Sequence, residues 1–257
     1  MTTKIPAELS STPGIVDNSD ATAITIDSSE NVGVGTTSPS TFSGFKTLHF
    51  KNGSGDTIFL NESDGGVIGQ ILTSDSVGAV TLGARSNHDL RLSTNDTERM
   101  RINTGGNVTK PNQTAFWAFN DATMTNVSTG YTDVNMGGDR YDIGGNFNNS
   151  NGQFTAPVTG KYYLEANIGL QNIPLNADWL IIQIQTSNHA YNFSKPTLNW
   201  DNTSGGYIHT ISCSTIADMD ENDIAYVRFY QYAGTADTDI YGTGGNSYTY
   251  FCGYLLG

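Results

Sequence analysis

Charged residues are scarce in this chain of 257 residues, and basic ones are scarcer than acidic ones. Charged side chains make up 14% of the sequence, against about 25% in an average globular protein. The 12 Lys and Arg residues stand against 25 Asp and Glu, so the formal net charge is −13. Nucleic-acid binding needs Lys and Arg to neutralise phosphates, and this balance therefore argues against a nucleic-acid partner.

Long apolar runs and helical periodicity are also missing. No segment approaches the ~18 apolar residues of a membrane span, and the first residues lack the apolar core of a secretory signal. We therefore expect neither membrane insertion nor export by that route. No long window has apolar residues at i, i+3, i+4 and i+7, whereas Gly and Tyr are abundant. The sequence predicts an all-β protein with almost no helix.

Cysteines and catalytic motifs are few. Cys213 and Cys252 are the only cysteines, and both fall in predicted core strands. Two buried free thiols are expected there, with a disulfide as the alternative. The four histidines have no metal-ligand spacing, and no G-x-S-x-G, HExxH or P-loop motif is present. We expect a protein that is not an enzyme and needs no cofactor.

The densest group of acids is Asp218, Asp220, Glu221 and Asp223, and it begins like a calcium-binding loop. The glycine and the glutamate that such a loop requires are replaced by Asp223 and Phe229. We interpret the segment as a solvated turn between two strands. A calcium ion held by Asp218, Asp220 and Asp223 is the alternative.

The first part of the chain is polar and repetitive. We expect residues 1–22 to form a poorly structured or docked arm. The phrase ITIDSSENVG at residues 24–33 returns as MRINTGGNVT at residues 100–109, and each copy predicts a strand, a tight turn and a second strand. Strands of about four residues bury too little apolar surface to stand alone. We therefore expect residues 23–111 to form a β shaft in which three chains supply one another's partners.

Longer and more aromatic strands follow the segment Lys110-Pro111-Asn112, and we place a second domain at residues 112–257. In residues 161–170, alternate residues starting at Tyr162 are apolar, so this strand has one buried side. Strands of this length joined by turns favour two packed antiparallel sheets, as in a jelly roll. The predicted strands are 114–119, 153–155, 161–170, 178–186, 207–213, 224–232 and 247–256.

Two aromatic rows need more burial than one sheet provides. Tyr250 and Tyr254 share one face of the last strand, the opposite face is apolar too, and neither carries a charge. One face enters the core, and the other needs a partner that three-fold assembly would supply. Tyr226 and Tyr230 form a similar row. We predict that the trimer interface and core include Phe147, Phe154, Tyr162, Tyr226, Tyr230, Tyr250 and Tyr254.

Residues 141–164 carry a more specific pattern, an aromatic, a polar turn, a second aromatic, a Pro/Gly corner and a strand. Its anchors are Asp142, Phe147, Phe154, Gly160 and Tyr162. This spacing resembles the C1q-type globular domain, a trimer-forming jelly roll of the tumour-necrosis-factor class, over about residues 112–257. The closing YFCGYLL is similar to the last core strand of that family. The resemblance implies a homotrimeric binding head.

The repeats DSSENVGVGTTSP and ERMRINTGGNV resemble those of bacteriophage tail-fibre shafts, and the opening MTTKIPAELSSTPG is similar to the virion-proximal start of phage fibres. The resemblance implies a virion protein assembled in the host cytoplasm, with residues 1–22 docked on tail or capsid proteins. We expect a homotrimeric tail fibre whose C-terminal knob binds a host cell-surface glycan or protein. A capsid or head fibre or decoration protein, a glycan depolymerase and a bacterial C1q-like lectin are alternatives.

Two segments that we interpret as loops, residues 189–193 and 198–202, place aromatic rings beside amides and a carboxylate. An aromatic ring stacks on the apolar face of a sugar, while amides and Asp bind its hydroxyls. Packing of Trp200 on its own domain is the alternative. The predicted receptor-binding residues are Trp200, Asp201, Asn202, Tyr191 and Asn192.

Overall fold

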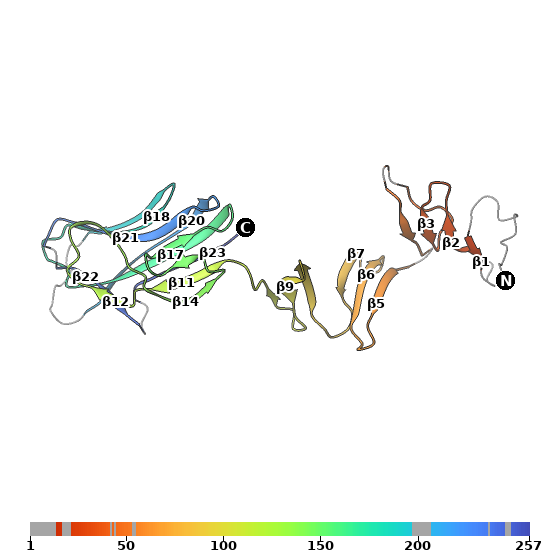
Figure 1. Cartoon of the computed structure of the whole chain (residues 1–257), viewed down its shortest axis with the longest axis horizontal. Coiled ribbons are helices and arrows are strands. Elements are labelled where there is room, and N and C mark those ends of the chain that lie inside the picture. Colours follow the sequence, from red (N-terminus) through yellow and green to blue (C-terminus); the bar gives the residue numbers. More distant parts are fainter. Residues whose placement is uncertain are drawn as a thin grey trace. The chain divides into compact units, whose positions relative to one another are not determined.

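The computed structural model is all-β, since every regular element among the described residues is a strand. It divides into two compact units, Met1–Thr109 and Lys110–Gly257. The predicted small N-terminal sheets followed by a β-sandwich are confirmed (Figure 1). None of the described residues lies in a helix long and apolar enough to cross a membrane. The structure describes residues 14–16, 22–41, 43, 45–52, 55–196, 207–235, 237–244 and 248–257.

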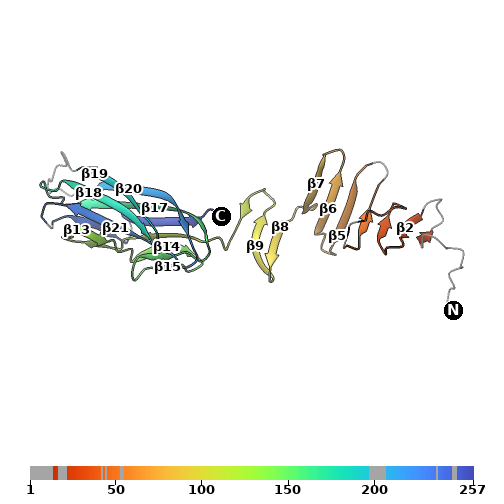
Figure 2. The same ribbon diagram turned by 90° about the horizontal axis from the view of Figure 1, so that it is seen from above.

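The first unit contains three small sheets (Figure 2). The first sheet is formed by β1 (Gly14–Val16), β2 (Thr22–Ile26), β3 (Val32–Val34) and β4 (Leu48–Phe50). The second is formed by β5 (Thr57–Glu62), β6 (Ile68–Ser74) and β7 (Ala79–Ala84). The third is formed by β8 (Leu90–Thr94), β9 (Thr97–Ile102) and β10 (Val108–Thr109). All pairings are antiparallel except the parallel pair β3–β4.

A turn of one geometry closes both copies of the repeated phrase. Asp27 Oδ1 accepts hydrogen bonds from the backbone N–H groups two and four residues further on, at 2.8 and 2.9 Å. Asn103 Oδ1 accepts the equivalent pair at 3.0 and 2.9 Å. In both turns the first residue also donates its N–H to the fifth residue's carbonyl at 3.0 Å, which pairs Asp27 with Asn31 and Asn103 with Asn107. Asp and Asn recur because their side chains can replace a backbone acceptor in a turn.

A third copy of this turn lies between β5 and β6. The Ser63 N–H donates to the Val67 carbonyl at 3.1 Å, and the Val67 N–H donates to Ser63 Oγ at 3.3 Å. The fourth residue of each turn has left-handed backbone, with φ of 61° at Glu30, 78° at Gly66 and 80° at Gly106. A Cβ is costly in this conformation, which explains the glycine in two of the three turns. The first unit therefore contains three copies of this turn, although the sequence repeat indicates only two.

No hydrophobic core forms within the described residues of the first unit. The buried hydrophobic side chains of the described chain run from Phe116 to Phe251 and all belong to the second unit. In the first unit, Val77 and Val80 are each 72% exposed and Leu82 is 60% exposed. The unit therefore has many apolar side chains but does not cover them with its own strands.

The second unit is a sandwich of two antiparallel sheets. The first sheet is formed by β11 (Ala115–Phe119), β12 (Ala122–Met124), β14 (Gly138–Ile143), β17 (Gly160–Gln171), β20 (His209–Met219), β22 (Asp239–Thr243) and β23 (Tyr250–Leu255). The second is formed by β13 (Gly130–Asp133), β15 (Phe147–Asn148), β16 (Gln153–Thr155), β18 (Trp179–Thr186), β19 (Ala190–Pro196) and β21 (Ile224–Tyr232). Their orders are β12-β22-β17-β23-β11-β14, with β20 also on β17, and β15-β16-β21-β18-β19, with β13 also on β21.

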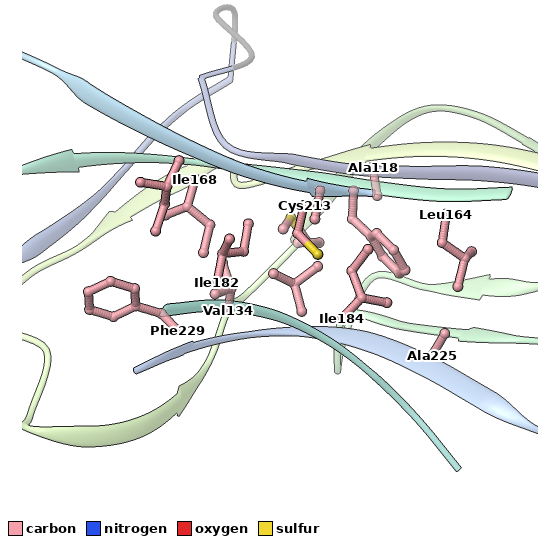
Figure 3. Close-up of a cluster of buried hydrophobic side chains, with 14 of the residues drawn as sticks. Ala118, Val134, Leu164, Ile168, Ile182, Ile184, Cys213, Ala225 and Phe229 are labelled. Atoms are coloured by element: carbon pink, nitrogen blue, oxygen red, sulfur yellow. The ribbon is translucent and has the colours of Figure 1, made fainter. Parts of the chain in front are cut away.

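Strand alternation builds the core between the two sheets. Leu164 and Ile168 of β17 point toward Ile182 and Ile184 of β18 and Phe229 of β21 (Figure 3), and all five are fully buried. The predicted inward face of residues 161–170 is thus confirmed. The other side of each strand is left for contacts outside the core.

The Asp142 carboxylate positions the aromatic end of this core. Its two oxygens accept hydrogen bonds from the backbone N–H groups of Asn146 and Phe147, each at 3.0 Å. These bonds hold the Phe147 ring 5.1 Å from the Phe116 ring, which in turn stacks 4.6 Å from Phe154. The spacing between acid and aromatic in the sequence is therefore a packing requirement.

One segment differs from its prediction. Residues 189–193 were expected to be a loop, but Ala190–Pro196 forms the edge strand β19. It pairs with β18 from Gln185 opposite Ala190 to Trp179 opposite Pro196. The hairpin closes where the Thr186 N–H donates to the His189 carbonyl at 2.8 Å. The mixed polar composition that suggested a loop is that of an edge strand with little burial.

Candidate functional site

The outer side of the first sheet carries an aromatic surface, which we call the β17–β23 face. Trp117 and Tyr250 lie with ring centroids 5.9 Å apart, and Tyr163 and Tyr254 lie 5.3 Å apart. The Arg140 guanidinium sits 4.5 Å from the Trp117 ring centroid, in cation–π geometry. Tyr254 is still 46% exposed. A surface of this kind suits contact with another protein chain, because aromatic rings and Arg are enriched in such interfaces.

A carboxylate lies within this face. The Tyr163 and Tyr250 hydroxyls both donate to Glu165, each at 2.7 Å. These hydrogen bonds, with that from Tyr163 the stronger cause, lower the pKa of the Glu165 carboxyl. Burial and the bond to Glu165 raise the pKa of Tyr250. The three side chains therefore form a fixed polar group inside an aromatic surface.

Both cysteines are free, but only one lies in the core. Cys213 is buried between the sheets (Figure 3). Cys252 points to the β17–β23 face and is only half-buried, which corrects the prediction of two core thiols. Burial, followed by the charge of Glu165, raises the pKa of the Cys252 thiol to about 12. A thiol that stays protonated at neutral pH is a poor nucleophile.

The opposite outer side of the sandwich, on β18, β19, β21 and β13, carries cross-strand rows of aromatic and polar side chains. We call it the β18–β21 face. Strand register places each row directly across the sheet. A cleft of about 490 Å³ opens on this face, lined by Trp179, Ile181, Ser194, Tyr230 and Tyr232. The rows are Trp179–Tyr232, Tyr131–Tyr230–Ile181–Ser194 and Asp133–Arg228–Gln183–Asn192.

A second cleft, of about 420 Å³, lies where the edge strands β19 and β20 approach each other. Its polar lining consists of hydroxyl, amide and carboxylate groups, and it has one large ring, that of Phe193. The lining of this cleft has one aromatic ring, whereas the cleft on the β18–β21 face is lined by three. The lining residues are Glu165, Asn192, Phe193, Ser212, Cys213 and Ser214.

The structure describes two of the five predicted receptor-binding residues, and it places these two on opposite sides of a strand. Trp200, Asp201 and Asn202 lie outside the described residues. Tyr191 packs against the core and Asn192 points to the outer face, because neighbours on a strand face opposite sides. These two residues therefore do not form one surface, and a receptor-binding role for the set stays a prediction.

The predicted trimer interface and core residues fall in three places. One group lies in the core of the chain itself, and the other two lie on the two outer faces of the sandwich. Since these faces point in opposite directions, one flat contact cannot cover both. The groups are Phe147, Phe154 and Tyr162 in the core, Tyr250 and Tyr254 on the β17–β23 face, and Tyr226 and Tyr230 on the β18–β21 face.

The acidic segment has the contacts of a turn. Asp223 Oδ2 accepts hydrogen bonds from the Asp220 N–H at 2.9 Å and from Asn188 Nδ2 at 2.7 Å. Lys161 Nζ lies 3.6 Å from Asp218 Oδ1. Among the residues that the structure describes, no three His, Cys, Asp or Glu side chains gather as a metal site would require. Calcium binding by these carboxylates stays a prediction.

Comparison with known proteins identifies the second unit. The C1q domain model matches residues 115–256, more than half of the chain. The chain belongs to the C1q domain family. C1q domains are generally binding modules without enzymatic activity, and C1q and tumour-necrosis-factor domains commonly form trimers. The resemblance read from Asp142, Phe147, Phe154, Gly160 and Tyr162 is thus confirmed for the C-terminal domain.

Two solved structures are similar to this C1q domain. The globular domain of zebrafish complement 1qA protein has 17% identity and a TM-score of 0.40, covering 56% of this chain and 98% of its own. Murine APRIL has 11% identity and a TM-score of 0.36, covering 56% of this chain and 99% of its own. No curated protein matches the sequence.

Proposed function

We propose that this chain is a homotrimeric structural protein of a phage virion, a tail fibre whose C1q knob binds a receptor on the host cell surface. Residues 1–22 attach to tail or capsid proteins, residues 23–111 form the shaft, and residues 112–257 form the knob. The protein is assembled in the host cytoplasm and acts on the virion. Its mechanism is binding, and three equal knobs convert a weak contact with a surface glycan into avidity.

The uncovered apolar surface of the first unit carries this proposal. Burying a Val or Leu side chain fully is worth about 1.5–3 kcal/mol. Side chains as exposed as Val77, Val80 and Leu82 would each gain on the order of 1–2 kcal/mol from a partner. Small sheets without a core are not stable by themselves in water. Identical chains wound together supply the missing partners at every repeat, as a fibre shaft requires.

The knob offers its own contact surface for the same assembly. The β17–β23 face is aromatic and half-exposed, and the Tyr163 and Tyr250 hydroxyls on it donate hydrogen bonds to the Glu165 carboxylate. A homo-oligomeric interface is expected to have an apolar centre with satisfied polar groups. This face therefore suits contact between knobs and leaves the opposite side of the sandwich for a receptor.

Labelled full-length protein tests the proposed role. The proposal predicts that the fluorescent trimer binds host cells and that virions stained for the C-terminus are labelled at the tail. Label over the shell would favour a head fibre or decoration protein. Release of reducing ends from host polysaccharide would favour a depolymerase. Failure of the trimer to bind host cells would contradict a receptor-binding knob.

A further inference from the structure

We infer that the β18–β21 face is a carbohydrate-binding site that takes a neutral sugar chain against the rings of Trp179 and Tyr232. The inference rests on the proposed receptor-binding role of the knob, and it names the location of the site and the chemical class of its ligand. It also places the receptor-binding site on the outer face of a sheet, whereas the sequence had suggested the segment around Trp200.

Two large rings form the apolar part of the site. Trp179 and Tyr232 are directly opposite each other on β18 and β21, and they are 48% and 53% exposed. Side chains in such a cross-strand pair are about 4.5–5.5 Å apart at Cβ, and both rings line the same cleft. The cleft of about 490 Å³ beside them falls within the roughly 300–1,000 Å³ of small-ligand sites. The apolar C–H face of a sugar ring fits a surface of this kind.

Polar groups line the same cleft and the adjacent row. Ser194 places a hydroxyl at the cleft. In the next row, Gln183 Nε2 donates to Asn192 Oδ1 at 2.6 Å, which leaves the amide nitrogen of the exposed Asn192 as a donor. Gln183 Oε1 is buried and accepts no hydrogen bond from the described residues. Hydroxyl and amide groups beside an apolar surface are what orients a polyhydroxylated ligand.

Charge pairing indicates that the ligand is neutral. Arg228 Nε lies 2.9 Å from Asp133 Oδ1, and the Arg228 guanidinium lies 4.6 Å from the Tyr131 ring centroid. Among the described residues of the three rows, no charge is left unpaired. A polyanion would require free Lys or Arg, which these rows do not offer. The Asp133–Arg228 ion pair instead lies in the row beside the aromatic residues.

Size favours a sugar over a protein partner. Five residues line the cleft, whereas a stable protein interface buries about 800 Å² and roughly 20–30 residues a side. The face also lies on the opposite side of the sandwich from the β17–β23 face. Assembly of the trimer through the β17–β23 face therefore leaves one open sugar site on each knob.

The test uses the full-length protein on an immobilised panel of bacterial surface polysaccharides and on host cells. Trp179→Ala and Tyr232→Ala are expected to weaken polysaccharide binding at least ten-fold, a loss of about 1.4 kcal/mol. Trp179→Phe keeps a ring and is expected to retain most of the binding. Tyr207→Ala removes a 67% exposed aromatic outside the rows and serves as the matched control. Unchanged thermal melting of each variant shows that folding is intact.

The outcomes separate this inference from the proposed function. Loss with Trp179→Ala and retention with Trp179→Phe support the sugar site. Loss with Trp200→Ala but not with Trp179→Ala would overturn the location and keep the receptor-binding role. Cell binding that survives periodate oxidation of cell-surface sugars but not protease treatment would overturn the sugar as ligand. A wild-type trimer that binds neither cells nor polysaccharides would overturn the proposed function itself.

Discussion

Replacing Gly66 by Ala should destabilise the first unit, whereas replacing its neighbour Gly65 should not. Gly66 has φ of 78° at the fourth position of the third turn, and a Cβ there would meet no atom within 4 Å. The cost is therefore purely conformational, about 1–2 kcal/mol for a left-handed residue with a Cβ. Unfolded Ala has less conformational freedom than unfolded Gly, and this difference stabilises the folded variant by about 0.4–1 kcal/mol. The net loss in the free energy of unfolding is therefore near 1 kcal/mol per chain.

Calorimetry of the full-length protein measures this difference. A loss of about 1 kcal/mol lowers the melting temperature of a unit of this size by about 4–8 °C. In a trimer the energy loss and the unfolding entropy both scale with the number of chains, so the shift is the same. A Cβ at Gly65 would lie 3.9 Å from Ser63 Oγ on ordinary backbone, and this variant should melt at or above the wild-type temperature. Equal shifts for the two variants would refute the repeated-turn geometry.

Three further changes test the C1q domain. Asp142→Ala removes both acceptors of the turn before Phe147 and should cost about 1–2 kcal/mol in urea unfolding, while Asp142→Asn should cost less because one acceptor remains. The pKa of Glu165 is lowered in the folded protein, so its stabilisation is present above the ordinary value of 4.5 and is lost as the pH falls through the lowered value. Glu165→Gln should therefore be less stable than wild type at pH 7 and equal to it in strong acid; a pH-independent difference would contradict this. Phe154→Ala should cost about 3–5 kcal/mol, because the ring is fully buried, and a smaller loss would mean that the core refills the space.

The strands of the sandwich could be predicted from the sequence better than the outer face on which each side chain lies. Residues 153–155 and 224–232 form strands with the predicted bounds, because their alternation reflects one buried side. The edge strand β19 was missed because an edge strand needs few apolar residues. Alternation also does not tell which sheet a strand joins, so Tyr230 and Tyr254 were grouped although they lie on opposite faces.

The site and the third turn depended on contacts that the sequence does not show. Trp179 and Tyr232 become neighbours only through the register of β18 and β21. Ser63 shares with Asp27 and Asn103 the two hydrogen bonds to the fifth residue of the turn, yet its different side chain hides the repeat. Hydrogen-bond geometry therefore revealed what residue identity did not.

Sedimentation equilibrium of the full-length protein in native buffer tests the central proposal most directly. The proposed trimer rests on the apolar side chains of the first unit that its own strands leave exposed, from Ile26 to Val108. We expect a single species of three times the chain mass that resists mild SDS. A stable, cooperatively melting single chain at the same concentration would contradict it.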